Sequence, residues 1–294
     1  MKQEIINYFA NNFITRRWQK RLFKSLTPDQ AWRSINDGDA KIFYSPKAMG
    51  GPSFDISNQK EAGFINYEKK SKDEFIKLIP HNGTCFDIGA NIGLFTTYIA
   101  LNRTDVIIHS FEPEQFAFSC LKRSVNSIQT NNITPHNFAL GEKEDNIKIH
   151  LSPKNDGGHT LLPNRAYSDK NFIPSGTIKV HNPQSLISSG KIPSPLALKI
   201  DVEGFEAQVL RGLLDELTKN KPLMLIELNN AEVFEKKEIF KILSSIYDGA
   251  PDVFFKIPED KEEEFSFKEL CDHAHQQHLD GKVLSNYLIY RKSI

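Results

Sequence analysis

The sequence predicts an α/β protein built on a doubly wound, mostly parallel sheet with helices on both faces. From residue 84 onward, short apolar runs of strand length alternate with longer amphipathic runs of helical length. The first apolar run passes through a glycine turn directly into a helix, in the stretch FDIGANIGLFT at 86–96. This alternation is typical of parallel sheets covered on both faces, which bind ligands beyond the carboxyl ends of their strands.

The expected elements of the main domain follow one another in this order. The core strands are expected at 84–89 (TCFDIG), 106–111 (VIIHSF), 134–140, 195–201 (PLALKID) and 222–228 (PLMLIEL), with closing strands at 252–257 and 286–291. Helices are expected at 71–79, 92–101, 114–128, 204–218 and 236–247. Two extra strands, at 146–152 and 176–182, flank a polar loop.

Composition sets limits on the class of protein. The 294 residues contain 37 Lys and Arg and 37 Asp and Glu, so the formal net charge is zero, which argues against a general nucleic-acid binder. Three widely spaced cysteines favour a reducing, cytoplasmic compartment. No apolar run approaches the roughly 18 residues of a transmembrane helix, and the start of the chain does not resemble a signal peptide. Cys271, His275 and His278 share a helical face, but they lack an obvious fourth ligand, so no metal is expected.

The chain is expected to divide into a segment over residues 1–70, acting as an arm or lid, and a main domain over residues 71–294. Residues 1–27 place apolar residues at helical spacing and carry a basic second half, which predicts one or two amphipathic helices. Packing on the main domain is favoured over a homodimerisation arm or contact with an anionic membrane or glycolipid surface. Residues 44–66 are rich in Gly, Pro, Ser and Asn and predict a loop or hairpin.

The glycine turn points to a nucleoside ligand without phosphate. A dinucleotide fingerprint needs three glycines at fixed spacing, but this turn has only Gly89 and Gly93, and Asp87 stands at the strand end. A carboxylate there repels a pyrophosphate and suits S-adenosylmethionine, whose carboxylate can accept N–H groups from the following helix start. Glu112, at the tip of the next strand, is placed to accept hydrogen bonds from ribose hydroxyls.

At this point the chain resembles the FkbM family of methyltransferases. The matching stretches are FDIGANIGLFT (86–96), FEPEQ (111–115), NFALGE (137–142), LKIDVEGFEAQVLRG (198–212) and LIELN (225–229). The resemblance implies a Rossmann-like class I fold and an S-adenosylmethionine-dependent O-methyltransferase that acts on hydroxyls of sugars or secondary metabolites. The cofactor-binding residues are then expected to be Asp87, Gly89, Ala90, Asn91, Gly93, Glu112, Asn137 and Asp201.

Four residues are candidates for the chemical step. Asp201 ends a core strand and is the first choice for the base or the group that orients the acceptor, with Glu203 second. Strand alternation puts Lys199 on the same side as Asp201, and such a lysine needs an acidic partner, either Asp201 or Glu227 at the end of the neighbouring strand. Alternatively, Lys199 forms an ion pair with a purely structural role. Capping of the following helix is the alternative to a catalytic role for Glu203.

His159, in the polar loop, is the fourth candidate, because an imidazole titrates near neutral pH; an ordinary surface loop is the alternative. The expected function is therefore O-methylation of a hydroxyl on a glycan or sugar-containing acceptor, selected by loops 44–66 and 152–176. A polyketide or other small metabolite is the alternative acceptor. A nicotinamide-dependent oxidoreductase is disfavoured by Asp87 and the missing glycine, and a non-catalytic binding module is disfavoured by the three carboxylates at positions 87, 112 and 201.

Overall fold

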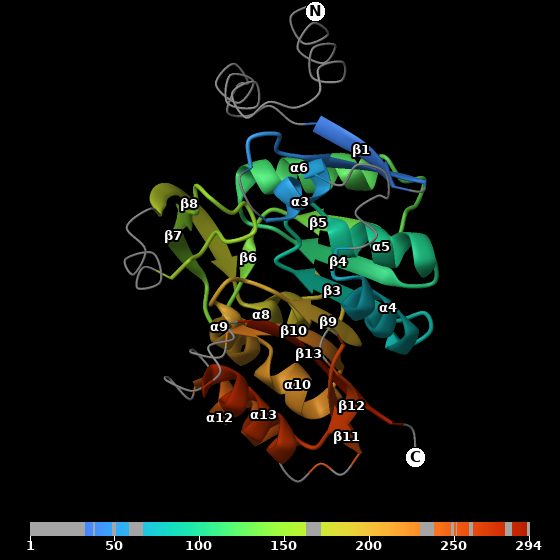
Figure 1. Ribbon diagram of the computed structural model, residues 1–294, viewed down its shortest axis with the longest axis vertical. Coiled ribbons are helices and arrows are strands. Elements are labelled where there is room, and N and C mark those ends of the chain that lie inside the picture. Colours follow the sequence, from blue (N-terminus) through green and yellow to red (C-terminus); the bar gives the residue numbers. More distant parts are fainter. Residues whose placement is uncertain are drawn as a thin grey trace, which may run out of the picture.

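An eight-stranded sheet in the order β12-β11-β13-β10-β9-β3-β4-β5 forms the centre of the protein (Figure 1). The computed structural model describes residues 33–37, 39–48, 51–58, 67–162, 172–229, 238–247, 250, 252–258, 261–279 and 284–292. Five neighbouring strands are parallel: β5 (Ile133–His136), β4 (Ile107–Phe111), β3 (Thr84–Ile88), β9 (Ala197–Ile200) and β10 (Leu223–Asn229). The other three pair antiparallel: β13 (Leu284–Arg291) with β10 and β11 (Val253–Ile257), and β12 (Lys261–Phe265) with β11.

Helices cover both faces of this sheet, which confirms the predicted fold class. On one face, Cys85 of β3 and Ala197 of β9 pack with Phe75 of α4 (Lys69–Leu78) and Phe95 of α5 (Leu94–Asn102). On the opposite face, strand residues such as Leu198 join one large apolar cluster with a second set of helices. These helices are α8 (Pro183–Ser188), α9 (Glu206–Gly212), α10 (Leu214–Asn220), α12 (Glu238–Tyr247) and α13 (Phe267–Leu279).

The strand predicted over residues 134–140 is in fact two strands in different sheets. β5 ends at His136, whereas β6 (Ala139–Leu140) joins a small sheet with β7 (Asp145–Leu151) and β8 (Ile173–His181), which lies beside the main sheet (Figure 1). The side-chain amide of Asn137 donates to the carbonyls of Glu112 and Pro113 and fixes the chain where it leaves the main sheet. The two extra strands predicted around the polar loop correspond to β7 and β8.

The helix predicted over residues 204–218 is also divided. Glu203 and Gly204 have φ angles of +52° and +100°, which a helix does not tolerate, so α9 begins only at Glu206. α9 then ends at Gly212, where a Cβ atom would stand 2.5 Å from the carbonyl oxygen of Gly141. The chain around Gly141 therefore packs closely against Gly212, at the point where α9 ends and the chain turns into α10.

The described part of residues 1–70 contains more regular structure than expected. A hairpin of β1 (Arg33–Asp37) and β2 (Ala40–Tyr44) packs on α6 (Gln115–Asn126), and α3 (Pro52–Asn58) replaces part of the loop predicted at 44–66. Proline is favoured at the first position of a helix, which the loop-like composition concealed. The helices predicted within 1–27 lie outside the described residues, and the domain boundary at residue 70 stays a prediction. No helix among the described residues has the length and apolarity needed to cross a membrane.

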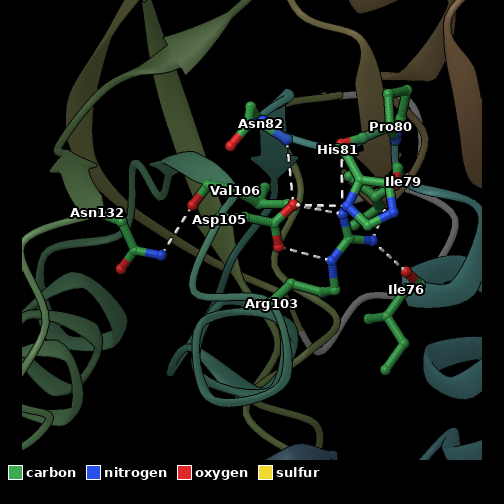
Figure 2. Close-up of polar contacts among 9 residues, drawn as sticks. All are labelled: Ile76, Ile79, Pro80, His81, Asn82, Arg103, Asp105, Val106 and Asn132. Atoms are coloured by element: carbon green, nitrogen blue, oxygen red, sulfur yellow. Dashed lines mark hydrogen bonds and ion pairs between the residues drawn. The ribbon is translucent and has the colours of Figure 1, made fainter.

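A single arginine ties together the amino-terminal edge of the sheet (Figure 2). Arg103 donates to both carboxylate oxygens of Asp105 at 2.8 Å, and its Nη1 donates to the carbonyls of Ile76 and Ile79 at 2.8 Å each. The end of α5 is thereby fixed to the end of α4, and the Arg103 guanidinium lowers the pKa of Asp105 well below its ordinary value. This edge lies opposite the carboxyl ends of the parallel strands.

Replacing Arg103 tests this connection. Arg103→Met removes charge-assisted hydrogen bonds and should lower the free energy of unfolding by about 1–3 kcal/mol in urea titrations followed by circular dichroism. The Lys77–Glu74 pair, with an exposed lysine, is the control, and Lys77→Met should have a much smaller effect because water screens that charge. Because the native pKa of Asp105 is depressed, the advantage of wild type over Arg103→Met should be full above about pH 5 and should shrink as pH falls below that. Equal losses for the two variants would contradict a special role for Arg103.

Candidate functional site

A cavity of about 320 Å³ lies at the carboxyl ends of β3, β4, β9 and β10. Ligand sites of parallel sheets occur at this edge, and the volume is within the range of small-molecule sites. The wall includes several of the residues that the sequence predicted. Gly89, Ala90, Asn91, Glu112, His159, Lys199, Asp201 and Glu203 line the cavity, whereas Asp87, Gly93 and Asn137 do not.

The glycine turn is fixed against both neighbouring strands. Gly89 has a φ of +84°, and a Cβ atom added there would stand 1.8 Å from the carbonyl oxygen of Asp201. The N–H groups of Gly89 and Ala90 both donate to the carbonyl of Phe111. Only glycine allows this close approach of the β3 turn to the end of β9.

The N–H groups expected to bind a ligand at the start of α5 are already hydrogen-bonded within the protein. The N–H of Asn91 donates to Glu112, that of Ile92 to the Asn91 side chain, and that of Gly93 to the carbonyl of Ala90. The N–H groups through residue 93 are therefore engaged within the protein. Leu94 and Phe95, which come next, line the cavity at the start of α5, where the helix dipole favours an anionic group.

Glu112 is held rigidly at the tip of β4. One carboxylate oxygen accepts the N–H of Asn91 at 2.8 Å and the other accepts the N–H of Glu114 at 2.7 Å. Asn137 lies behind the cavity wall and donates to the Glu112 carbonyl at 2.9 Å. Burial raises the pKa of Glu112 to about 8, although the two N–H donors favour its ionised form. Each oxygen has further acceptor capacity for a ligand hydroxyl.

Beneath the cavity, a row of polar side chains crosses the sheet on the face covered by α5. The Thr96 hydroxyl donates to Asp87 at 2.6 Å and lies 2.7 Å from the Ser110 hydroxyl. Asp87 is fully buried and stands opposite Lys199 in the β3–β9 register. Asp87 therefore balances the charge of Lys199 from below the cavity floor.

Lys199 connects this row to the cavity, as the alternation of β9 predicted. Its side chain is only 5% exposed, and its Nζ donates to Asp201 at 2.8 Å and lies 4.9 Å from the centre of the Phe95 ring. Burial alone would lower the pKa of Lys199, but the carboxylates of Asp201 and Asp87 outweigh burial and raise it. The lysine thus stays protonated, and its predicted acidic partner is Asp201.

Glu227, near the carboxyl end of β10, also lines the cavity and hydrogen-bonds to Asp201. The negative charge of Asp201, together with burial and this hydrogen bond, raises the pKa of Glu227 to about 11. The position of Glu227 at a strand end was the only signal in the sequence for this contact. Glu68, which precedes α4, joins the same wall without any local signal in the sequence.

Glu203 is not the residue that caps α9. The buried side chain of Glu206 accepts the N–H groups of Val202 and Gly204 at 3.3 and 3.0 Å. Glu203 instead lines the cavity, and its carbonyl accepts the Thr160 hydroxyl at 2.9 Å. The N-cap position of α9 is Phe205, so the capping alternative for Glu203 is wrong, and the Thr160 bond ties the polar loop to the end of β9.

His159 reaches the cavity from that loop with one ring nitrogen already engaged. Its Nδ1 accepts the N–H of Ser152 at 3.1 Å, so the neutral ring carries its proton on Nε2. Burial lowers the pKa of His159, which favours this neutral form. In this arrangement the imidazole offers a hydrogen-bond donor to a ligand rather than a basic nitrogen.

The polar loop also closes over the glycine turn. The carbonyl of Asp156 accepts the side-chain amide of Asn91 at 2.9 Å, and its carboxylate accepts the N–H of Ser53 at 3.3 Å. Asp156 lines the cavity, and burial raises its pKa to about 6. The part of the chain that the structure describes contains no group of three or more His, Cys, Asp or Glu arranged to hold a metal ion. The side chains of Cys271, His275 and His278 lie outside that part.

Comparison with known proteins identifies relatives of this chain. Residues 87–250 match the family model described as the methyltransferase FkbM domain. The hexuronic acid methyltransferase AglP of Haloferax volcanii is 26% identical over 159 residues, which are 54% of this chain and 60% of that protein. Methyltransferase 1 of Beauveria bassiana is 28% identical over 151 residues, or 47% of this chain and 61% of that protein. The alignments thus span about three-fifths of the length of these curated relatives.

Solved structures include similar folds at low sequence identity. A crystal structure of methyltransferase FkbM from Methylobacillus flagellatus aligns with 74% of this chain and 50% of its own, at 14% identity and a TM-score of 0.44.

The buried charge of Lys199 should be essential for stability. Lys199→Met leaves Asp87 and Asp201 facing each other without a cation, and loss of one partner of a buried ion pair typically costs about 3–5 kcal/mol. The control is Lys256→Met, which removes a partly exposed pair with Glu74 and should cost about 1 kcal/mol or less. Urea denaturation of both variants measures the difference. Similar losses for the two variants would show that water, rather than Lys199, neutralises these carboxylates.

Proposed function

The chain belongs to the FkbM methyltransferase family, and from that premise we propose that it transfers a methyl group from S-adenosylmethionine to a hydroxyl of a glycan or another sugar-containing acceptor. The observation that carries the proposal is the placement of Gly89, Glu112 and Asp201 around one cavity. The glycine turn, an acid for the ribose and an acid for the acceptor there occupy the ends of three adjacent strands.

The residues of the cavity suit this cofactor. Both oxygens of Glu112 can accept a ribose hydroxyl, and the start of α5 suits the carboxylate of the methionine part. An apolar wall formed by Leu140, Ile149 and Leu161 suits the adenine ring. Six of the described residues lining the cavity are Asp or Glu and one is Lys; with Glu227 protonated and Lys199 paired with Asp201, the remaining acids still favour a ligand with positive charge. When bound, S-adenosylmethionine supplies a methyl group activated by a positively charged sulfur.

The acceptor hydroxyl needs alignment and a place for its proton. Asp201 stands at the carboxyl end of β9 and lines the cavity, so its carboxylate is our choice to accept that proton as the new oxygen–carbon bond forms. Lys199 holds Asp201 from behind, and His159 can donate a hydrogen bond to another acceptor oxygen. Much of the rate can then come from fixing the hydroxyl in line with the methyl group.

The acidic wall also bears on the acceptor. A carboxylate or phosphate beside the reacting hydroxyl would face Glu203 and Glu68, so we favour a neutral, hydroxyl-rich acceptor. The name of the Haloferax relative, a hexuronic acid methyltransferase, supports a sugar but names an acidic one, so only the sugar class is taken from it. A polyketide or other small metabolite is the second candidate. We further propose a cytoplasmic location. Homodimerisation and surface contact through the basic N-terminal segment stay proposals.

Calorimetry with S-adenosylhomocysteine tests the cofactor and the role of Glu112. Only the ionised carboxylate accepts from both ribose hydroxyls, so affinity should rise by up to about tenfold per pH unit as pH increases from about 6 towards the pKa of about 8. Glu112→Gln should weaken binding about tenfold or more and remove most of this pH dependence. NAD should not bind. Binding of NAD without S-adenosylhomocysteine would refute the proposed function.

Single-turnover methyl transfer with labelled cofactor tests the chemical step. Asp201→Asn should leave S-adenosylmethionine affinity within a few-fold and slow transfer by roughly 10²–10⁴. His159→Ala should have a smaller effect, because His159 offers a donor rather than a base, and Glu203→Gln should also do less. If Asp201→Asn stays active while His159→Ala or Glu203→Gln loses transfer, the residue whose replacement abolishes transfer is the base instead.

A further inference from the structure

We propose that Glu227 and Asp201 share one proton, and that Glu227 acts through it as a positioning residue that aims the Asp201 carboxylate at an uncharged acceptor hydroxyl. This inference rests on the proposed function for its catalytic meaning. The shared proton itself is a property of the protein alone, so the two can fail separately.

The strand register brings the two carboxyl groups together. β9 and β10 are parallel, with Lys199 opposite Leu225 and Ile200 opposite Ile226. The next residues along the two chains are Asp201, which directly follows β9, and Glu227, which is still within β10, so their side chains lie side by side on the face shared by Lys199. Both line the cavity, and their side chains hydrogen-bond to each other.

A hydrogen bond between two carboxyl groups requires a proton, because ionised carboxylates only accept. Lys199 donates to Oδ2 of Asp201 at 2.8 Å, which favours the ionised form on Asp201 and leaves the proton on Glu227. The raised pKa of Glu227 agrees with this assignment. The charged or titratable groups facing Glu227 are Asp201, Glu203, Glu68, Tyr67 and, through Asp201, Lys199.

This arrangement has two consequences for an acceptor. With Lys199 and Glu227 both donating to it, Asp201 is held in one orientation and keeps its remaining acceptor capacity for the ligand. Lys199, Asp201 and protonated Glu227, the members of this group that line the cavity, together carry no net charge, and buried Asp87 lies below the cavity floor. An alcohol can therefore donate a hydrogen bond to Asp201 without adding charge to this group. An ammonium group would add a positive charge that no carboxylate of the group is left to balance.

Infrared difference spectroscopy on the ligand-free protein tests the shared proton. At about pH 9, where Glu112 is ionised, the spectrum of wild type minus Glu227→Gln should contain the C=O stretch of a protonated carboxylic acid. The control is Glu144→Gln, an acid whose side chain is 58% exposed and whose pKa is lowered, and its removal should delete only carboxylate bands. Absence of the acid band from the Glu227 difference spectrum would overturn the proposal.

Single-turnover transfer tests the positioning role. The amide of Glu227→Gln can still donate to Asp201, so the rate should stay within about tenfold of wild type, whereas Glu227→Leu should lose about a hundredfold, the cost of a small misplacement. Equal losses in the two variants would overturn the positioning role. If wild type shows the acid band but binds no S-adenosylhomocysteine, the proposed function fails and the shared proton stands. If wild type binds S-adenosylhomocysteine normally but lacks the acid band, the shared proton fails and the proposed function stands.

Discussion

A protonated lysine inside an apolar sheet is costly unless carboxylates surround it, and Lys199 meets that condition from two directions. Asp87 approaches from β3 below the cavity, and Asp201 follows on the same strand at the cavity wall. A shift of one residue between β3 and β9 would move Asp87 to the opposite face and leave the lysine unbalanced. The buried charge therefore specifies the register of the central strands, as well as contributing to the site.

That register in turn brings the glycine turn against the end of β9. The N–H of Asp201 donates to the carbonyl of Ile88, and Gly89 lies too close to the Asp201 carbonyl for any side chain to fit between them. The turn after β3 and the acid after β9 consequently form one packed unit. A cofactor held by the turn and an acceptor held by Asp201 would share a fixed frame, so their mutual alignment needs no further loop.

Local patterns in the sequence were sufficient for most of the sheet and for the strand-end acids. Alternation along 197–201 placed Lys199 beside Asp201, and the strand-tip position of Glu112 placed it at the cavity. The same alternation sends Asp87 under α5 rather than into the cavity, which only the pairing with β9 reveals. The breaks at Asn137 and Gly212 depend on contacts with Glu112 and Gly141, distant in sequence, so no local pattern predicts them. Asp156 and Glu68 likewise reach the cavity through tertiary packing alone.

The position of β13 has a consequence for biosynthesis. β13 lies between β10 and β11 in the sheet, although it follows both in the chain. β11 and β12 therefore connect to the parallel strands only through β13, which is synthesised after them. During synthesis, the parallel half from β3 to β10 emerges with its β10 edge still unpaired by β13. Exposed strand edges pair readily with other chains. A chain truncated before residue 284 would contain every cavity residue through Glu227, but the β10 edge at the centre of its sheet would be open to aggregation.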